Sequence, residues 1–146
     1  MPEKETLERA AKDKAEGKAP STQAGEFVRE EIEHVREGKH GARSTKQAIA
    51  IGLSKARRAG VELEPPEKGS KKIRDQAKRD LRKGKKAGKA KKSTKRSRAV
   101  SQALKKEGHS AASKRSLSRQ ARAAAAKRSA ASRSRSAKKA AATRKK

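Results

Sequence analysis

The side chains best suited to chemistry in this sequence are its lysines and arginines, and that chemistry is phosphate binding. Of 146 residues, 44 are Lys or Arg and 16 are Asp or Glu, which gives a net charge of +28. Residues 1–67 carry equal numbers of basic and acidic side chains, so the excess lies in residues 68–146, with 31 basic and three acidic side chains. Lysine offers a mobile point charge, and arginine a two-pronged fork for phosphate oxygens. The side chains predicted to bind nucleic-acid phosphates are Lys71, Lys72, Arg74, Lys78, Arg79, Arg82, Lys83, Lys85, Lys86, Lys89, Lys91, Lys92, Lys95, Arg96, Arg98, Lys114, Arg115, Arg119, Arg122, Lys127, Arg128, Arg133, Arg135, Lys138, Lys139 and Arg144.

Nucleic acid is the partner that this charge predicts. Duplex DNA carries about one negative charge per 1.7 Å of its axis, and release of condensed counterions drives binding without regard to base sequence. The chain shows no zinc-ligand set, no helix-turn-helix pattern and no row of aromatic residues that could stack on bases. We therefore expect histone-like binding or compaction of duplex DNA with little sequence preference. RNA binding stays open as an alternative, because residues 127–139 alternate arginine and serine.

Enzymatic chemistry is not indicated. The chain has no cysteine, and its three histidines, His34, His40 and His109, have no partnered cysteines or convergent carboxylates in the sequence. No phosphate-cradling glycine loop follows a strand pattern. His34 lies four residues after Glu30, a spacing typical of a pair on a helix surface. We expect no enzyme activity, no cofactor and no metal site.

The elements that must position the cations are short helices in a chain that we expect to be mostly disordered. Hydrophobic residues make up only 30% of the sequence, with one Phe and no Trp or Tyr. A chain of low hydrophobicity and high net charge buries too little surface to offset the entropy of ordering. The composition predicts no β-sheet. The predicted segments are a frayed helix over residues 1–20, a helical hairpin over 21–64, a Pro/Gly linker over 65–72 and a basic arm with transient helices over 73–146.

The first helix of the predicted hairpin ends at Gly38. At 100° per residue its apolar side chains fall on one side, while Glu26, Glu30, Glu33 and Glu37 fall on the other. These acids are either a solvated face or a docking surface for a basic partner, which could be the basic arm itself.

The second helix runs from Ser44 to Gly60. Ser44 and Gln47 form the S-x-x-Q pattern of a capping box, and Gly60 followed by Val61 is typical of a helix C-terminus. Gly52 in mid-helix indicates either close approach of a neighbour or loose packing in a marginal module, since glycine weakens a helix. Two short helices are marginal alone, so we expect self-association or a protein partner to stabilise them. The predicted interaction face comprises Phe27, Val28, Ile32, Val35, Ile49, Ile51 and Leu53.

Within the arm, residues 70–84 have the pattern of a further helix. Ser70 can cap its start, Asp75 and Arg79 are spaced as an i,i+4 pair, and Gly84 is positioned to stop it. Residues 84–97 have no apolar seam and are expected to be extended. The alanine-rich residues 116–131 favour a helix once phosphates neutralise their charges.

The stretch RSTKQAIAIGLSKARRAG, Arg43 to Gly60, resembles the motif of a family of small basic bacterial proteins, in which an S-x-KQAIAIGLS-x-ARRAG segment sits beside Lys/Ala/Ser-rich sequence. Residues 97–146 resemble linker-histone tails and bacterial histone-H1-like proteins in composition. The resemblance implies a bacterial protein of the cytoplasm, associated with the nucleoid if it binds DNA. It carries over no functional residues.

Two other classes of protein remain to be weighed. Anionic membranes attract polybasic segments, but the arm has no Trp or Phe and no broad apolar face to insert, so no membrane partner is expected. A protein-interaction adaptor, in which the hairpin selects a partner and the arm adds charge, stays open.

Overall fold

The computed structural model describes residues 1–86 and 93–144, and it is helical, with 73% of residues in helices. Within those ranges there are seven α-helices, one 3₁₀ turn and no strand. The absence of a sheet agrees with the sequence-based expectation, whereas the expectation of a mostly disordered chain is wrong. The elements are α1 (Lys4–Ala15), α2 (Pro20–Arg36), α3 (Thr45–Arg58), α4 (Lys71–Lys85), α5 (Thr94–Lys105), η1 (Ser110–Ala112), α6 (Lys114–Ala126) and α7 (Ala130–Arg144).

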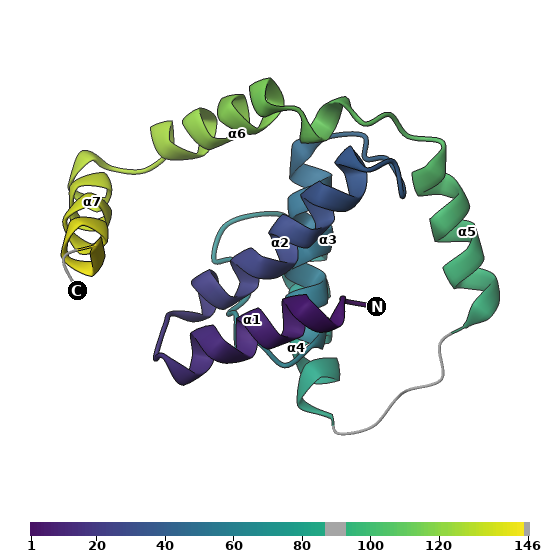
Figure 1. Cartoon of the computed structure of the whole chain (residues 1–146), viewed down its shortest axis with the longest axis horizontal. Helices are drawn as coiled ribbons and strands as arrows, with labels where there is room; N and C mark the ends of the chain where they lie inside the picture. Colours follow the sequence, from purple (N-terminus) through teal and green to yellow (C-terminus); the bar gives the residue numbers. More distant parts are fainter. Residues whose placement is uncertain (87–92, 145–146) are drawn as a thin grey trace.

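Helices α2 and α3 form an antiparallel pair at the centre of the molecule (Figure 1). The ends of α3 are those expected. The Ser44 hydroxyl accepts a hydrogen bond from the Gln47 backbone N–H at 3.2 Å. Gln47 Oε1 reaches one residue further back than a capping box requires, to the N–H of Arg43 at 2.8 Å. Gly60 adopts φ +97°, where a side chain would be strained, and Val61 N–H then bonds to Ala56 O at 3.1 Å.

The predicted close approach at Gly52 is confirmed. A Cβ at Gly52 would lie 2.6 Å from the Cα of Val28, so only glycine lets the α2 backbone pass so near. The side of α3 that packs on α2 does not centre on Ile49, Ile51 and Leu53, the α3 members of the predicted interaction face. Its buried positions are Thr45, Ala48, Gly52 and Ala56, a row of small side chains, while Ile49 and Leu53 are half-buried at its flanks.

The apolar core consists of two clusters, one at each end of the α2–α3 pair. Large side chains from α2 meet mostly alanines from the neighbouring segments, which is how a chain with few large apolar residues fills an interior. One cluster holds Ile32, Val35, Ala42, Ala48, Ala111 and Ala112, with Val28 and Leu117 against it. The other holds Ala10, Ala24, Phe27, Ala56 and Val61, with Leu53 and Leu63 against it.

Helix α1 packs along α2 through polar contacts. Arg9 Nε donates to Glu26 Oε2 at 2.7 Å, and the backbone N–H of Glu3 donates to Glu30 Oε2 at 3.0 Å. Glu30 is therefore only 2% exposed. The expectation that the acids of α2 form a solvated face is wrong for Glu30, because α1 covers it.

Helix α4 packs on α3. Ser70 caps it as expected, accepting from the N–H of Ile73 at 3.4 Å. The predicted stop at Gly84 is wrong: the helix continues to Lys85, and Gly84 lies where a Cβ would collide with the carbonyl oxygen of Arg57. The predicted Asp75–Arg79 pair does not form, since Arg79 Nη2 donates instead to Gln76 Oε1 at 2.8 Å.

Helices α5 and α6 and the turn η1 are tied to the α2–α3 pair at a few points. The N–H groups of Gly41 and Ala42 donate to the carbonyls of Leu104 and Gly108 at 2.9 and 3.0 Å. The buried hydroxyl of Thr45 donates to Ala111 O at 2.6 Å. Helix α5 runs along one side of the bundle, α6 lies across its end, and α7 extends away from it on the opposite side (Figure 1).

The basic half forms helices for local reasons that its composition alone does not show. Serines cap all four of its α-helices: Ser70, Ser93, Ser113 and Ser129 each accept a hydrogen bond from the backbone N–H three residues later, at 3.2–3.4 Å. A capping serine contributes about 1 kcal/mol to a helix. Residues 94–97, expected to be extended, therefore lie in α5. Every helix in the described ranges is too short or too polar to span a lipid bilayer.

Candidate nucleic-acid interface

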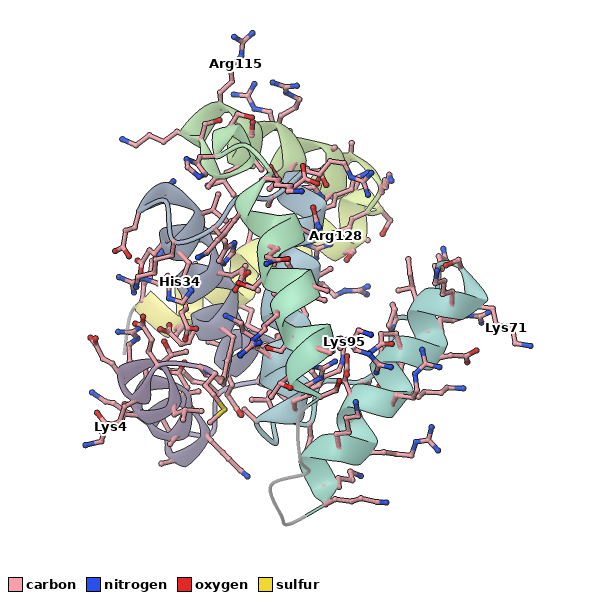
Figure 2. All side chains as sticks on the ribbon, turned by 90° about the vertical axis from the view of Figure 1, so that its right-hand side faces the viewer. Lys4, His34, Lys71, Lys95, Arg115 and Arg128 are labelled. Atoms are coloured by element: carbon pink, nitrogen blue, oxygen red, sulfur yellow. The ribbon has the colours of Figure 1, made fainter. Side chains whose placement is uncertain are left out.

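The cations expected to bind phosphate lie on the surface of α4 to α7 and the segments that join these helices. Lys89, Lys91 and Lys92 fall outside the described residues. Every other member of the predicted set is exposed. Figure 2 shows Lys71 and Arg115 extending away from the body of the molecule.

These cations are free of carboxylate partners in the described ranges. All the ion pairs found there lie within residues 3–58, apart from the pair between Arg58 and Asp80. The N-terminal half instead neutralises its charges internally, as Arg9 pairs with Glu5 and Glu26, and Lys39 pairs with Glu3 and Glu37. Ion pairs are thus concentrated in α1 to α3 and the loops that join them, whereas the described cations of α4 to α7 make none.

Asp80 holds α4 in its orientation. It is 1% exposed and accepts hydrogen bonds from Ser54 Oγ at 2.7 Å, Arg58 Nε at 2.7 Å and Gln76 Nε2 at 3.1 Å. Burial opposes ionisation of the carboxyl, but these donors and the charge of Arg58 outweigh it, so the pKa of Asp80 lies below its usual range. With Ala77, Asp80 and Gly84 turned toward α3, the opposite side of α4 faces solvent.

That solvent-facing side of α4 is basic. Lys71, Lys78 and Arg82 are spaced at i, i+7 and i+11, which places them on one face of a helix, and all three are exposed. A groove between α4 and the preceding segment is lined by Lys78, Arg82 and Lys85, but also by Glu62 and Glu64. The groove's mixed charge makes it a poor phosphate pocket. Lys78 and Arg82 belong to both surfaces, so the exposed basic face of α4 borders the groove along one edge.

Helix α6 carries a second basic stripe. Arg115, Arg119 and Arg122 lie at i, i+4 and i+7, and all are exposed. Leu117 lies on the opposite side of the helix and packs against the core, so the docking of α6 turns the three guanidinium groups outward. Helix α7 has no buried residue. Its cations point in all directions around its axis, since they follow no helical period.

The predicted interaction face is largely used within the chain. Phe27, Ile32 and Val35 are buried between helices, and Val28, Ile49, Ile51 and Leu53 are half-buried. The most exposed large aliphatic side chains lie elsewhere, at Ile73 on α4 and Val100 on α5.

Sequence-based reasoning missed three residues whose side chains could act together as ligands. Glu31 and His34 of α2 and His40 of the following loop each offer a ligand atom, and these atoms lie within 4.8 Å of one another. The expected surface pair of His34 with Glu30 is wrong, because His34 Nε2 lies 2.9 Å from Glu3 Oε1 instead. The overlooked signal is the spacing Glu-x-x-His, which places Glu31 and His34 on one face of a helix, followed by a histidine just after the Gly38 turn.

Comparison with known proteins finds one match, to a family model. Residues 13–68, from the last turn of α1 to the segment beyond α3, match the model described as "Family of unknown function (DUF6496)". No curated protein and no solved structure matches the chain. The match includes the Arg43–Gly60 motif and ends before α4. The helical pair at the centre of the fold is therefore similar to a family without a known function, and the basic helices lie outside the likeness.

Proposed function

We propose that this protein binds nucleic acid through the exposed cations of α4 to α7, with duplex DNA as its main ligand and little preference for base sequence. The observation that carries the proposal is that the described cations of this half are exposed and have no carboxylate partner. Unpaired surface cations meet phosphates without first breaking ion pairs, and the counterions released from the duplex supply the driving force.

The arrangement of arginines supports phosphate contact over base contact. The α6 stripe of Arg115, Arg119 and Arg122 presents three guanidinium forks in a row, about 6 Å and 4.5 Å apart along the helix axis. Their fixed spacing comes from a helix whose other side is anchored by Leu117. Such a row can follow a phosphate backbone.

Duplex is favoured over single strands because the protein has no stacking platform. Proteins that bind single-stranded nucleic acid place bases on exposed aromatic rings. This chain has no Trp or Tyr, and its one Phe, Phe27, is 1% exposed. Binding to DNA in a bacterial cytoplasm would associate the protein with the nucleoid.

Fluorescence anisotropy with random-sequence duplex DNA, duplex RNA and single-stranded RNA, over a series of KCl concentrations, tests the proposal. We expect the binding constant for duplex DNA to fall steeply as KCl rises. The logarithm of the binding constant should fall linearly with the logarithm of the salt concentration. Tighter binding to either RNA would overturn the preference for DNA. A flat salt response, or no binding to any nucleic acid, would overturn the function.

A matched pair of variants assigns binding to a surface. Replacing Arg115, Arg119 and Arg122 with Gln removes three unpaired cations, and replacing Lys4, Lys12 and Arg29 with Gln removes the same charge from ion pairs of the bundle. Each lost phosphate contact should lower the salt slope by about 0.9. The α6 variant should thus lose up to about 2.7 in slope, while the bundle variant keeps the slope of the natural protein.

A further inference from the structure

Glu31, His34 and His40 form a cluster apart from the basic surface. Glu31 and His34 lie on consecutive turns of α2, and the chain then reverses at Gly38 and brings His40 back over them. The imidazole rings of His34 and His40 are edge to face, with centroids 6.0 Å apart. Figure 2 marks His34 on α2.

The ring of His40 is oriented by the backbone. Its Nδ1 lies 3.0 Å from the carbonyl oxygen of Gly41, and a carbonyl can only accept, so Nδ1 carries the proton. In the neutral ring Nε2 is then a bare lone pair, and it faces Glu31 Oε1 at 3.2 Å. Two acceptors so close repel each other unless the ring takes a second proton or a metal ion lies between them. A backbone carbonyl that fixes the tautomer is the usual companion of a metal-binding histidine.

The carboxylate of Glu31 is buried, and one of its oxygens makes no hydrogen bond. The side chain is 1% exposed, and Oε2 has no hydrogen-bond partner, although the ammonium group of Lys55 approaches it to 2.6 Å without hydrogen-bond geometry. Lys55 also contacts Glu30, at 3.3 Å, so one ammonium group is shared by two buried carboxylates. Negative charge therefore remains on the Oε1 side of Glu31, facing the histidines.

We propose that Glu31, His34 and His40 bind one divalent transition-metal ion of the Zn²⁺ class. Two ligands at 2.0–2.1 Å from a tetrahedral ion lie about 3.3 Å apart, which fits the 3.2 Å between Glu31 Oε1 and His40 Nε2. Imidazole with a single carboxylate suits Zn²⁺ and its neighbours, whereas Mg²⁺ and Ca²⁺ require more oxygen ligands. The fourth position is open to water or to the carboxylate of Glu3, which already contacts His34.

The ion would stiffen the loop between α2 and α3, to which part of the basic half is hydrogen-bonded. That loop holds the N–H groups of Gly41 and Ala42, which bind the carbonyls of Leu104 in the last turn of α5 and of Gly108 after it. A bond from His40 to an ion on α2 fixes the loop at its start. The site thus has a structural consequence for the attachment of α5 and η1, independent of the proposed binding of nucleic acid.

Titration calorimetry of the metal-free full chain with ZnCl₂ in 150 mM salt, and Co²⁺ absorption spectra, test the site. We expect one Zn²⁺ per chain, tetrahedral Co²⁺ bands displaced by Zn²⁺, and a melting temperature raised by Zn²⁺. His40→Gln and Glu31→Gln should each weaken Zn²⁺ at least about tenfold. His109→Gln removes the histidine outside the cluster and should leave Zn²⁺ binding unchanged.

Far-UV circular dichroism of each metal-free variant separates loss of ligand from loss of fold. If Glu31→Gln unfolds, His40→Gln alone decides, since Nε2 lies at the edge of the site. The proposal fails if the natural protein binds no Zn²⁺, if His40→Gln binds as tightly as the natural protein, or if His109→Gln weakens binding equally. None of these results depends on whether the protein binds DNA.

Discussion

Arg58 of α3 donates a hydrogen bond from Nε to Oδ1 of Asp80 in α4, at 2.7 Å, and so joins the central pair of helices to the first basic helix. Ser54, one turn before Arg58, donates to the other oxygen of the same carboxylate at 2.7 Å. The buried acid of α4 thus serves to anchor the helix to α3. This contact sets which side of α4 packs and which side presents cations.

Removing Asp80 should loosen α4. We expect Asp80→Ala to lower the free energy of unfolding by about 1–3 kcal/mol, because the donors from Ser54 and Gln76 lose their partner; Arg58, half-exposed, can turn to water. Asp75→Ala is the matched control, as it removes the same charge from the same helix where no ion pair forms. Urea unfolding followed by circular dichroism measures both. Equal losses in the two variants would contradict the anchoring role.

Two glycines in the central helices should respond oppositely to alanine. Gly52→Ala places a Cβ 2.6 Å from the Cα of Val28 and should destabilise the protein by about 1–3 kcal/mol through overpacking. Gly25→Ala meets nothing within 4 Å and should be neutral or stabilise by up to about 1 kcal/mol, since alanine favours helix. Thermal melts of both variants give the comparison. A stabilised Gly52→Ala would show that the two helices do not pack as closely as described.

Features that depend on neighbours within four residues were the ones that sequence could predict. The caps at Ser44 and Ser70 and the ends at Gly38 and Gly60 follow from local backbone chemistry. The close approach at Gly52 was predicted only from the cost of glycine in mid-helix, and the sequence did not show that Val28 would be the neighbour. Contacts between distant segments could not be foreseen in the same way. Asp80 is one acid among many cations, and nothing near it in the sequence shows that Ser54 and Arg58 will meet it.

The expectation of disorder failed because it counted large apolar side chains. The core relies on alanines such as Ala48, Ala56 and Ala112, which bury little area each but allow helices to approach closely. It also relies on buried carboxylates that accept hydrogen bonds from nearby donors. A count of residue types shows these acids only as charged residues. The exposure of the arm cations was easier to predict, because Lys and Arg are almost never fully buried unless paired. Their arrangement in stripes depends on which side of each helix docks.

Acid should unfold the protein as its buried carboxylates take up protons. Burial opposes ionisation of Glu30, yet the Glu3 backbone N–H, Thr6 and Lys55 outweigh it, and the pKa of Glu30, like that of Asp80, lies below its usual range. The unfolded chain therefore binds protons at a higher pH than the folded one. The contribution of both groups is complete above about pH 5, where the unfolded carboxyls are ionised, and is lost as pH falls through their lowered folded pKa values.

Urea unfolding at pH 7, 5 and 3 measures this dependence. We expect little change between pH 7 and 5 and a marked loss at pH 3. Asp80→Asn should shrink the loss between pH 5 and 3, because that position no longer titrates. An unchanged pH profile in Asp80→Asn would mean that other carboxylates govern the acid response.

The hydroxyl of Thr45 should control how firmly the basic helices are held. It is buried and donates to Ala111 O at 2.6 Å, joining the start of α3 to η1 and so to α6. Thr45→Val keeps the shape but leaves the Ala111 carbonyl without its donor, at a cost of about 1–3 kcal/mol. Amide hydrogen exchange should then quicken at Ala42, whose N–H bonds to Gly108 O, more than at the centre of α2. Thr45→Ser keeps the donor and should preserve protection. Slow exchange at Ala42 in Thr45→Val would show that the basic helices are held by other contacts, since the hydroxyl is then not what fixes η1 to the bundle.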